Sequence, residues 1–276
     1  MKEHFRDVGE FSLSAGNLWR DVMRIRSEAP LIHNITNYVV MNSTANALLA
    51  LGASPVMAHA LEEMDEMVDL ARALVINIGT LSPRWVSAML KAGLRAKAKG
   101  APVVFDPVGS GATSFRTATA MQILNEVKPD IVRGNASEIL SLISSEKGTK
   151  GVDSTHQAEE IVDKARSLAV RCQCVVSISG ATDVIISAGR TIRVFNGHSL
   201  MPRVTGLGCS ATAITAAFAA VNREPLEAAV HGMALMGIVG ELAGERSPGP
   251  GSFQVQFLDA LHSVEEQDMH RLRVEI

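Results

Sequence analysis

This chain has few cysteines, few aromatic residues and a small net charge. Its 276 residues include three Cys, and Phe, Trp and Tyr together make up 4%. A chain of this length needs no disulfides, so three cysteines favour a reducing compartment, and we expect a cytoplasmic protein. The formal net charge is -3, which with so few aromatic rings excludes the basic, base-stacking surface of a general nucleic-acid binder. Small molecules are the favoured partners.

The sequence also shows no secretory signal and no clear membrane span. Residues 1–16 are rich in charge and lack the apolar core of a signal peptide. Two uncharged stretches, 31–61 and 204–222, are long enough to cross a bilayer, but the first contains several Asn and a Pro, and the second opens with Thr and Gly. We expect both to be buried elements of a soluble domain, with no membrane partner.

Short runs of branched apolar residues alternate with segments of helical spacing. Segments 82–99 and 154–169 have Ala, Val and Leu recurring among charged residues, which predicts helices. The predicted strands are 31–32, 55–57, 74–78, 102–105, 130–132 and 175–178. This alternation predicts an α/β fold of three layers, α/β/α, with a central, mostly parallel sheet and ligands at the carboxyl ends of its strands.

The pattern changes after residue 180. Two short β runs, 183–187 and 190–195, flank Ala-Gly and predict a hairpin, hence an antiparallel edge. Two apolar segments, 210–221 and 225–244, predict a packed helical pair, and the Pro-Gly-Pro-Gly of 248–251 predicts a loop before a last helix. The chain has no repeat and no linker-like tract, so one domain is the simplest account.

Polar residues and glycines follow several predicted strands directly. Asn77 ends the strand 74–78, and Asp106 follows 102–105 with glycines beyond it that allow a ligand to approach the backbone. The alternative for Asp106 is a turn or cap residue before a helix. Arg133 and Glu138 follow 130–132, and these side chains suit phosphate oxygens and Mg²⁺. Glu138 is also placed for a helix capping box, and both roles can coexist.

Gly206 and Gly208 open directly into an Ala-rich helix. Free N–H groups at a helix N-terminus carry partial positive charge, so this turn predicts a cradle for a phosphoryl oxyanion. Cys209 lies in the first helical turn, where its thiol pKa is expected below the usual ~8.5, although apolar packing would raise it. The segment 206–211 also matches a relaxed dinucleotide motif, but no strand precedes it. A Walker-type loop and a His-based zinc motif are both missing from the sequence.

Taken together, the motifs resemble those of the hydroxyethylthiazole kinase family of the ribokinase-like superfamily. They are the stretches 31–37, 54–58, 77–81, 106–109, 133–138 and 205–209, in the family's order over residues 20–265. The resemblance implies ATP-dependent phosphorylation of the hydroxyl of 4-methyl-5-(2-hydroxyethyl)thiazole, with Mg²⁺, in thiamine biosynthesis or salvage. It also implies a homotrimer with active sites at subunit interfaces, and residues 1–15 as an N-terminal extension before a kinase domain of 16–276.

The resemblance also implies roles for single residues. The implied set is Asn37, Met57 and Gly206 for the thiazole, Arg133 and Ser179 for ATP, Asp106 and Glu138 for the metal, and Cys209 with Gly206 and Gly208 for catalysis. Cys209 stands where most relatives of the superfamily carry an Asp that activates the hydroxyl. A thiol accepts that proton only when partly ionised, so positioning and charge neutralisation should dominate catalysis.

Two other functions remain open at this point. One keeps the fold and phosphorylates another small alcohol, such as hydroxymethylpyrimidine, although Cys209 in place of Asp argues against it. The other is a binding protein for a nucleotide or thiamine precursor without activity, which the retention of both acids, Arg133 and the glycine turn disfavours.

Overall fold

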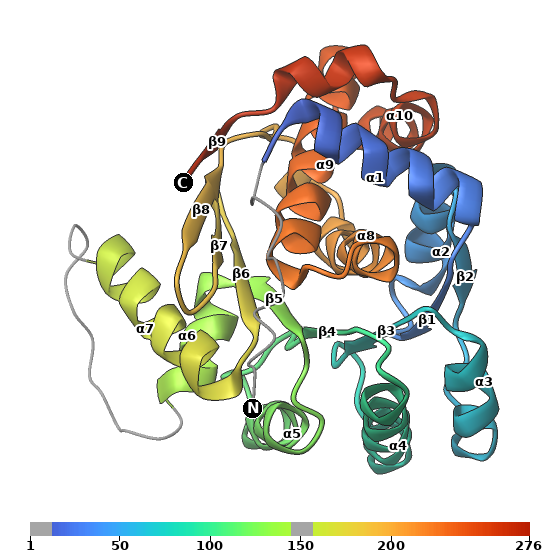
Figure 1. Cartoon of the computed structure of the whole chain (residues 1–276), viewed down its shortest axis with the longest axis vertical. Helices are drawn as coiled ribbons and strands as arrows, with labels where there is room; N and C mark the ends of the chain where they lie inside the picture. Colours follow the sequence, from blue (N-terminus) through green and yellow to red (C-terminus); the bar gives the residue numbers. More distant parts are fainter. Residues whose placement is uncertain (1–12, 145–156) are drawn as a thin grey trace, which may run out of the picture.

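A single mixed sheet runs through the centre of the protein (Figure 1). The computed structural model describes residues 13–144 and 157–276, so most of the predicted extension 1–15 and the start of the predicted helix 154–169 lie outside the described residues. The described strands are β1 (Leu31–Ile35), β2 (Ser54–Val56), β3 (Ala73–Asn77), β4 (Val103–Asp106), β5 (Ile131–Asn135), β6 (Val175–Ser179), β7 (Asp183–Ile186), β8 (Thr191–Val194) and β9 (Val274–Glu275).

The strand order is β2-β1-β3-β4-β5-β6-β7-β8-β9. The first six strands of this order pair in parallel, whereas β7, β8 and β9 pair antiparallel. All six predicted parallel strands and the predicted hairpin are therefore confirmed. The strand β9 was not predicted, because a two-residue strand carries too little alternation to be recognised.

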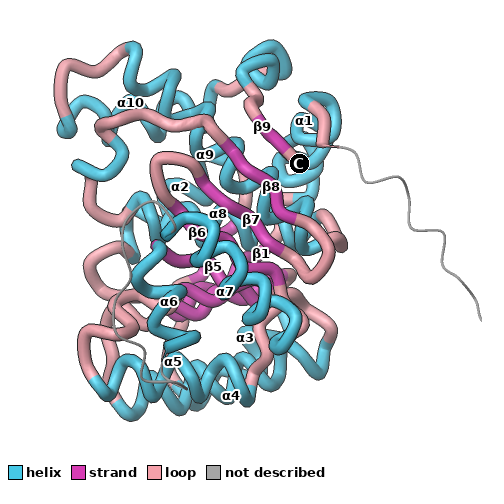
Figure 2. The backbone as a smooth tube through the Cα atoms, turned by 90° about the vertical axis from the view of Figure 1, so that its left-hand side faces the viewer, coloured by secondary structure: helices cyan, strands magenta, loops and turns pink. Residues whose placement is uncertain are grey.

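Helices cover both faces of the sheet (Figures 1 and 2). One face carries α3 (Met64–Leu70), α4 (Pro83–Lys99), α5 (Ser114–Glu126), α6 (Ala136–Ser144) and α7 (Gln157–Cys172). The other face carries α1 (Ala15–Glu28), α2 (Met41–Leu51), α8 (Leu207–Val221), α9 (Pro225–Glu245) and α10 (Pro250–Ser263). Short 3₁₀ turns are η1 (Leu61–Glu63), η2 (Met201–Arg203) and η3 (Glu266–Arg271). The predicted three-layer architecture is confirmed.

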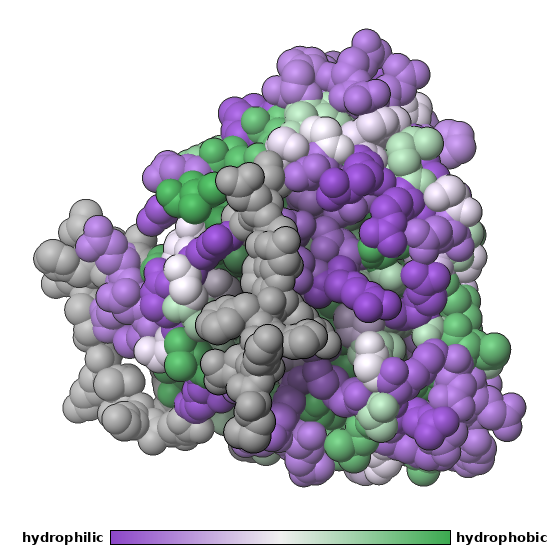
Figure 3. Space-filling view, in the orientation of Figure 1, coloured by the Kyte–Doolittle hydropathy of each residue, from purple (hydrophilic) through white to green (hydrophobic). Residues whose placement is uncertain are grey.

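The alternation of side chains along each strand divides the core in two. In β3, Val75 packs into the cluster beneath α1, α2, α8, α9 and α10, whereas Leu74 and Ile76 pack beneath α3 to α7. In β4, Val104 and Phe105 divide in the same way. Because successive strand side chains point to opposite faces, strands that are apolar at every position must be covered on both sides. The face drawn in Figure 3 is accordingly mainly hydrophilic over the outer helices.

The predicted helical pair is α8 and α9, which pack against each other. By length and composition α9 could cross a membrane, but 83% of its most apolar window is buried inside the protein. Burial in the core therefore explains the apolar composition of α9. The expectation of a loop over 248–251 was partly wrong, because α10 begins at Pro250. Proline suits this first helical position, where its missing N–H has no intrahelical partner.

Candidate active site

The carboxyl ends of the central strands and the start of α8 meet at one edge of the sheet. Asn77 and Asp106 are the last residues of β3 and β4, and these two positions face each other in the strand register. Asn37 follows β1, and Cys209 lies in the first turn of α8. Because β1, β3 and β4 are adjacent and parallel, residues far apart in the sequence lie together here.

Asp106 is held in a buried, hydrogen-bonded position. The residue is 1% exposed, and its Oδ2 accepts hydrogen bonds from Asn77 Nδ2 and from Thr212 Oγ1, each at 2.8 Å. Burial raises the pKa of Asp106 to about 6, and the charge of Glu138 acts in the same direction. The positive charge of Arg133 and the two hydrogen bonds oppose this rise. A nearby cation would therefore stabilise the ionised carboxylate.

The Cys209 thiol lies within the same network. Its Sγ accepts hydrogen bonds from Asn77 Nδ2 at 3.2 Å and from Asn37 Nδ2 at 3.5 Å. Burial and the neighbouring Asp106 raise the pKa of this thiol to about 11, although both amides and Arg133 lower it. The expectation of a lowered thiol pKa from the helix N-terminus was thus wrong, because desolvation outweighs the favourable helix end. At neutral pH the group is a thiol.

Glu138 lies across from Asp106 and caps α6. Its Oε2 accepts from Asn135 N at 2.9 Å, while Asn135 Oδ1 accepts from Glu138 N at 3.0 Å. This reciprocal arrangement is the capping box that the sequence predicted. The other oxygen, Oε1, accepts from Gly109 N at 2.9 Å in the loop after β4. The carboxylate is therefore fixed between two strand ends, and each oxygen keeps a second lone pair.

Arg133 and Ser179 line one cavity of about 650 Å³ beside the start of α8. Arg133 is 7% exposed, and its Nη1 donates to the carbonyl oxygen of Gly208 at 2.9 Å. Its buried Nε meets no hydrogen-bond acceptor among the described residues. The rest of the lining includes Met201, Met233 and Met236. A cavity of this size, largely apolar and with a buried guanidinium at one end, suits a nucleotide.

The glycine turn allows close approach at the start of α8. Gly206 is the N-cap residue with a φ of +89°, and a Cβ there would lie 2.8 Å from Val40 Cγ1. At Gly208 a Cβ would lie 3.0 Å from Arg133 Nη1, so glycine permits the guanidinium to reach the backbone. Gly206 therefore needs glycine for its backbone conformation and for space, whereas a side chain at position 208 would require the Arg133 guanidinium to shift.

Met57 lies apart from this network. It follows β2, which forms the edge of the sheet beyond β1, and its carbonyl oxygen faces His59 Nδ1 at 3.5 Å. Next to it, the rings of Tyr38, His59 and Trp85 form a cluster in which centroids lie 4.6 to 6.4 Å apart. The structure thus brings together Asn37, Asp106, Arg133, Glu138 and Cys209, while Met57 occupies the neighbouring sheet edge.

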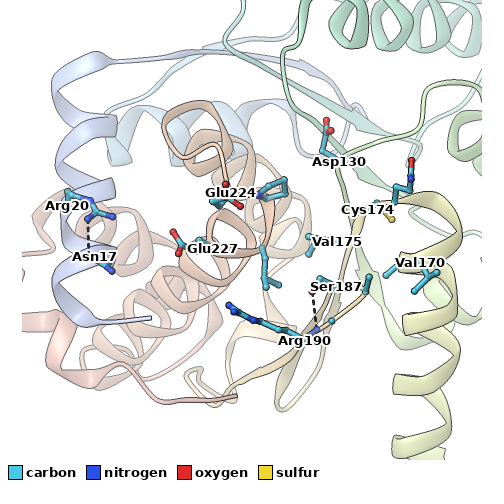
Figure 4. A pocket seen from close by; sticks show the side chains of 16 residues that line it. Asn17, Arg20, Asp130, Val170, Cys174, Val175, Ser187, Arg190, Glu224 and Glu227 are labelled. Atoms are coloured by element: carbon cyan, nitrogen blue, oxygen red, sulfur yellow. Dashed lines mark hydrogen bonds between the residues drawn. The ribbon is translucent and has the colours of Figure 1, made fainter. Parts of the chain in front are cut away.

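A larger cavity of about 1100 Å³ lies elsewhere (Figure 4). Asp130 and Cys174, which precede β5 and β6, line it together with Arg20 of α1, Arg190 of the hairpin and Glu227 of α9. It therefore opens at the amino ends of the parallel strands. None of the predicted site residues lines it, and its size alone does not make it the active site.

The donor set at the strand ends suits Mg²⁺ bound together with a phosphate. Within the described ranges, no group of three or more His, Cys, Asp or Glu side chains is placed to hold a metal ion. Asp106 and Glu138 supply two carboxylates, and burial together with the charge of Glu138 raises the pKa of Asp106. Mg²⁺ is usually bound by one or two carboxylates, with water and substrate phosphates completing the shell. The residues present therefore fit that ion.

Two members of the network, Asn77 and Thr212, were not predicted as site residues. Asn77 was noted at a strand end but received no role, and Thr212 was not singled out at all. The available signal for Thr212 was its position one turn after Gly208 in α8, on the side of the helix that faces β4. Asn77 could have been found from its register opposite Asp106 in the parallel pair.

Comparison with known proteins gives one consistent family. The model of the hydroxyethylthiazole kinase family matches residues 22–267. A hydroxyethylthiazole kinase from Syntrophus aciditrophicus is 59% identical over 260 residues, which cover 94% of this chain and 96% of the relative. One from Nitratidesulfovibrio vulgaris is 52% identical over 260 residues, covering 94% and 97%.

Solved structures agree with the sequence comparison. The hydroxyethylthiazole kinase of Pyrococcus horikoshii matches with a TM-score of 0.88 at 44% identity, over 94% of this chain and 98% of that one. A pyridoxal kinase from Staphylococcus aureus gives a TM-score of 0.60 at 16% identity, over 76% and 87%, which shows a shared fold alone. The predicted ribokinase-like fold is confirmed.

Proposed function

The chain belongs to the hydroxyethylthiazole kinase family, and on that premise we propose how its strand-end site carries out the reaction. The enzyme transfers a phosphoryl group from ATP to the hydroxyl of 4-methyl-5-(2-hydroxyethyl)thiazole, a step of thiamine biosynthesis and salvage. One observation carries the site assignment: Asp106, Arg133 and Cys209, from three elements, lie around the first turn of α8.

In this proposal ATP occupies the cavity of about 650 Å³, with Arg133 and Ser179 as its ligands. The guanidinium has a buried Nε that meets no acceptor among the described residues, and phosphate oxygens are natural acceptors for such a donor. The N–H groups of the first turn of α8, at Gly208 and Cys209, receive the charge that develops on the transferred group. Gly206 and Gly208 themselves add no side chain to this turn.

The thiazole is proposed to lie on the β1 side of Cys209, near Asn37, Gly206 and Met57. Cys209 contacts the hydroxyl as a weak acceptor, because a thiol with a pKa of about 11 is rarely ionised at neutral pH. Positioning therefore contributes more than proton removal. We further propose a homotrimer in which a neighbouring subunit completes the site beside Met57, at the sheet edge of β2.

Asp106 and Glu138 would hold Mg²⁺, which would neutralise the charge of the phosphates when bound. Asp106 ends β4 and Glu138 follows the neighbouring strand β5, so their fixed carboxylates suit a single ion. We also propose a cytoplasmic location, and a single kinase domain over 16–276 preceded by an extension of 1–15.

A coupled assay of ADP release tests the function. Purified protein with ATP and Mg²⁺ is offered a panel of small alcohols that includes hydroxyethylthiazole and hydroxymethylpyrimidine. We expect ADP release that depends on the thiazole. Release with another alcohol alone would keep the fold and overturn the substrate, and tight binding of ATP without release would support a binding protein instead.

A further inference from the structure

The carboxamide of Asn77 uses all of its hydrogen-bonding groups within the site. It is fully buried at the end of β3. Its Oδ1 accepts from Gly79 N and from Asn37 Nδ2, both at 2.9 Å, and its Nδ2 donates to Asp106 Oδ2 at 2.8 Å and to Cys209 Sγ at 3.2 Å. One side chain thus joins a proposed thiazole ligand, a proposed metal ligand and the thiol.

The network also fixes which way the carboxamide points. Gly79 N is a backbone donor, so the atom facing it must be the oxygen of Asn77. The NH₂ group then has to face Asp106 and Cys209, both of which can accept. The rotated alternative would set two donors against each other at Gly79 and would place an acceptor opposite the Asp106 carboxylate.

This orientation in turn determines how Asp106 is presented. Asn77 and Thr212 both donate to Oδ2 of Asp106, so Oδ1 receives neither bond. The two donors lie on different elements, β3 and α8, and together they restrain rotation of the carboxylate. Oδ1 is therefore left for the partners that the reaction brings.

We propose that Asn77 is a positioning residue for phosphoryl transfer, which aligns Asp106 and Cys209 through one carboxamide. The inference rests on the proposed function of this site. A displacement of about 1 Å in a reacting group can lower a rate by about 10²-fold, so loss of this alignment should appear in kcat. Binding of ATP should change little, because its proposed ligands Arg133 and Ser179 make no hydrogen bond with Asn77.

The sharpest variant is Asn77→Asp. It keeps acceptors for Gly79 N and Asn37, so the loop after β3 retains its shape, but it replaces the donors to Asp106 and Cys209 with an oxygen. We expect kcat to fall by roughly 10²-fold, with KM for ATP and thiazole within about threefold. The matched control is Asn34→Asp, another fully buried strand amide, whose Nδ2 donates to Ile32 O and to no other acceptor among the described residues. Its kcat should stay within about threefold of the wild type.

A double-mutant cycle with Thr212→Val separates positioning from general damage to the fold. If both residues act by orienting Asp106, their combined loss in kcat is smaller than the product of the single losses. If the losses in kcat multiply, or if kcat is unchanged in Asn77→Asp, the proposal is overturned. The proposed function still stands in that case, provided that the wild type is active. An inactive wild type would instead refute the function itself.

If the extra buried carboxylate prevents folding, Asn77→Ala gives the same test without added charge. Its kcat should fall while KM for ATP stays within about threefold, with thermal unfolding used to confirm the fold. A rise in KM for ATP that matches the fall in kcat would mark a structural role and overturn the proposal.

Discussion

Arg133 donates from Nη1 to the carbonyl oxygen of Gly208 at 2.9 Å, and this bond joins the middle of β5 to the first turn of α8. The two residues are 75 positions apart in the chain. The guanidinium thus lies beside the helix N-terminus that is proposed to receive the transferred group, and it lines the cavity that is proposed to bind ATP. The same side chain can therefore bind phosphate oxygens and fix the helix turn.

Removal of this guanidinium should weaken ATP binding selectively. In Arg133→Ala we expect KM for ATP to rise by roughly 10-fold or more, because a hydrogen bond to a charged group contributes about 1.5–3 kcal/mol. KM for the thiazole should change less. Steady-state kinetics with each substrate varied in turn measures the difference. Arg133→Lys keeps the positive charge but loses the paired donors of the guanidinium, so its KM for ATP should lie between those of the wild type and Arg133→Ala. Equal weakening of both substrates would mean that Arg133 is structural.

Cys209→Asp should keep or raise kcat. The two amide donors from Asn37 and Asn77 would meet a carboxylate, which they stabilise better than a neutral thiol. A carboxylate is also ionised at neutral pH far more often than a thiol with a pKa of about 11. Turnover at saturating substrates measures the effect.

Cys209→Asn is the uncharged control for this exchange, since it has the shape of Asp without its basicity. Its kcat should lie at or below that of the wild type. A loss in Cys209→Asp as large as that from disrupting the glycine turn would contradict a proton-accepting role at this position.

Gly206→Ala should abolish most activity by displacing the start of α8. Its φ is +89°, and the added Cβ would lie 2.8 Å from Val40 Cγ1, so the turn has to move. We expect kcat/KM to fall on the order of 10²-fold. The control is Gly100→Ala, where φ is +76° but an added Cβ would have no neighbouring atom within 4 Å among the described residues.

Gly100→Ala therefore reports the backbone strain alone, roughly 1–2 kcal/mol, without a clash at the site. Both variants should unfold at a lower temperature than the wild type, and only Gly206→Ala should lose activity. Similar kinetics in the two variants would show that the turn tolerates a side chain.

Asp183 should make the protein less stable at high pH. Burial raises the pKa of this carboxyl from 3.8 to about 6, even though Gly180 N and Arg133 favour its ionised form. The folded state therefore binds more protons than the unfolded state between pH 4 and 6, so stability falls as pH rises through that window. The full difference is roughly 3 kcal/mol.

Asp183→Asn removes this titration and keeps an acceptor for Gly180 N. Urea titrations should show that the variant gains stability relative to the wild type as pH rises, so that the difference in the free energy of unfolding, variant minus wild type, is larger at pH 8 than at pH 4.5. Asp69→Asn is the control, because the bond to Arg95 lowers the pKa of Asp69 in the folded protein and the carboxylate is ionised at both pH values. A difference that does not vary with pH would contradict the assignment to Asp183.

Much of the fold followed from local sequence patterns. The strands β3 and β4 are almost wholly apolar runs of four or five residues, which only a sheet covered on both faces can bury. Parallel strands place their carboxyl ends at one edge, so the position of Asp106 was predictable once the strands were recognised. Arg133 was expected just beyond its strand, but it lies inside β5, which continues to Asn135. The capping box at Glu138 was also visible, because its residues are only three apart.

Tertiary structure alone decided the chemistry of the site. The pKa of Cys209 depends on burial and on Asp106, which lies 103 positions earlier in the chain and acts only because the fold brings it close. Asn77 and Thr212 meet at one oxygen of Asp106 from a strand and a helix, a contact that no local pattern encodes. Sequence periodicity sets which face of an element is buried, whereas hydrogen bonds and desolvation depend on distances between elements, and those distances exist only in the folded chain.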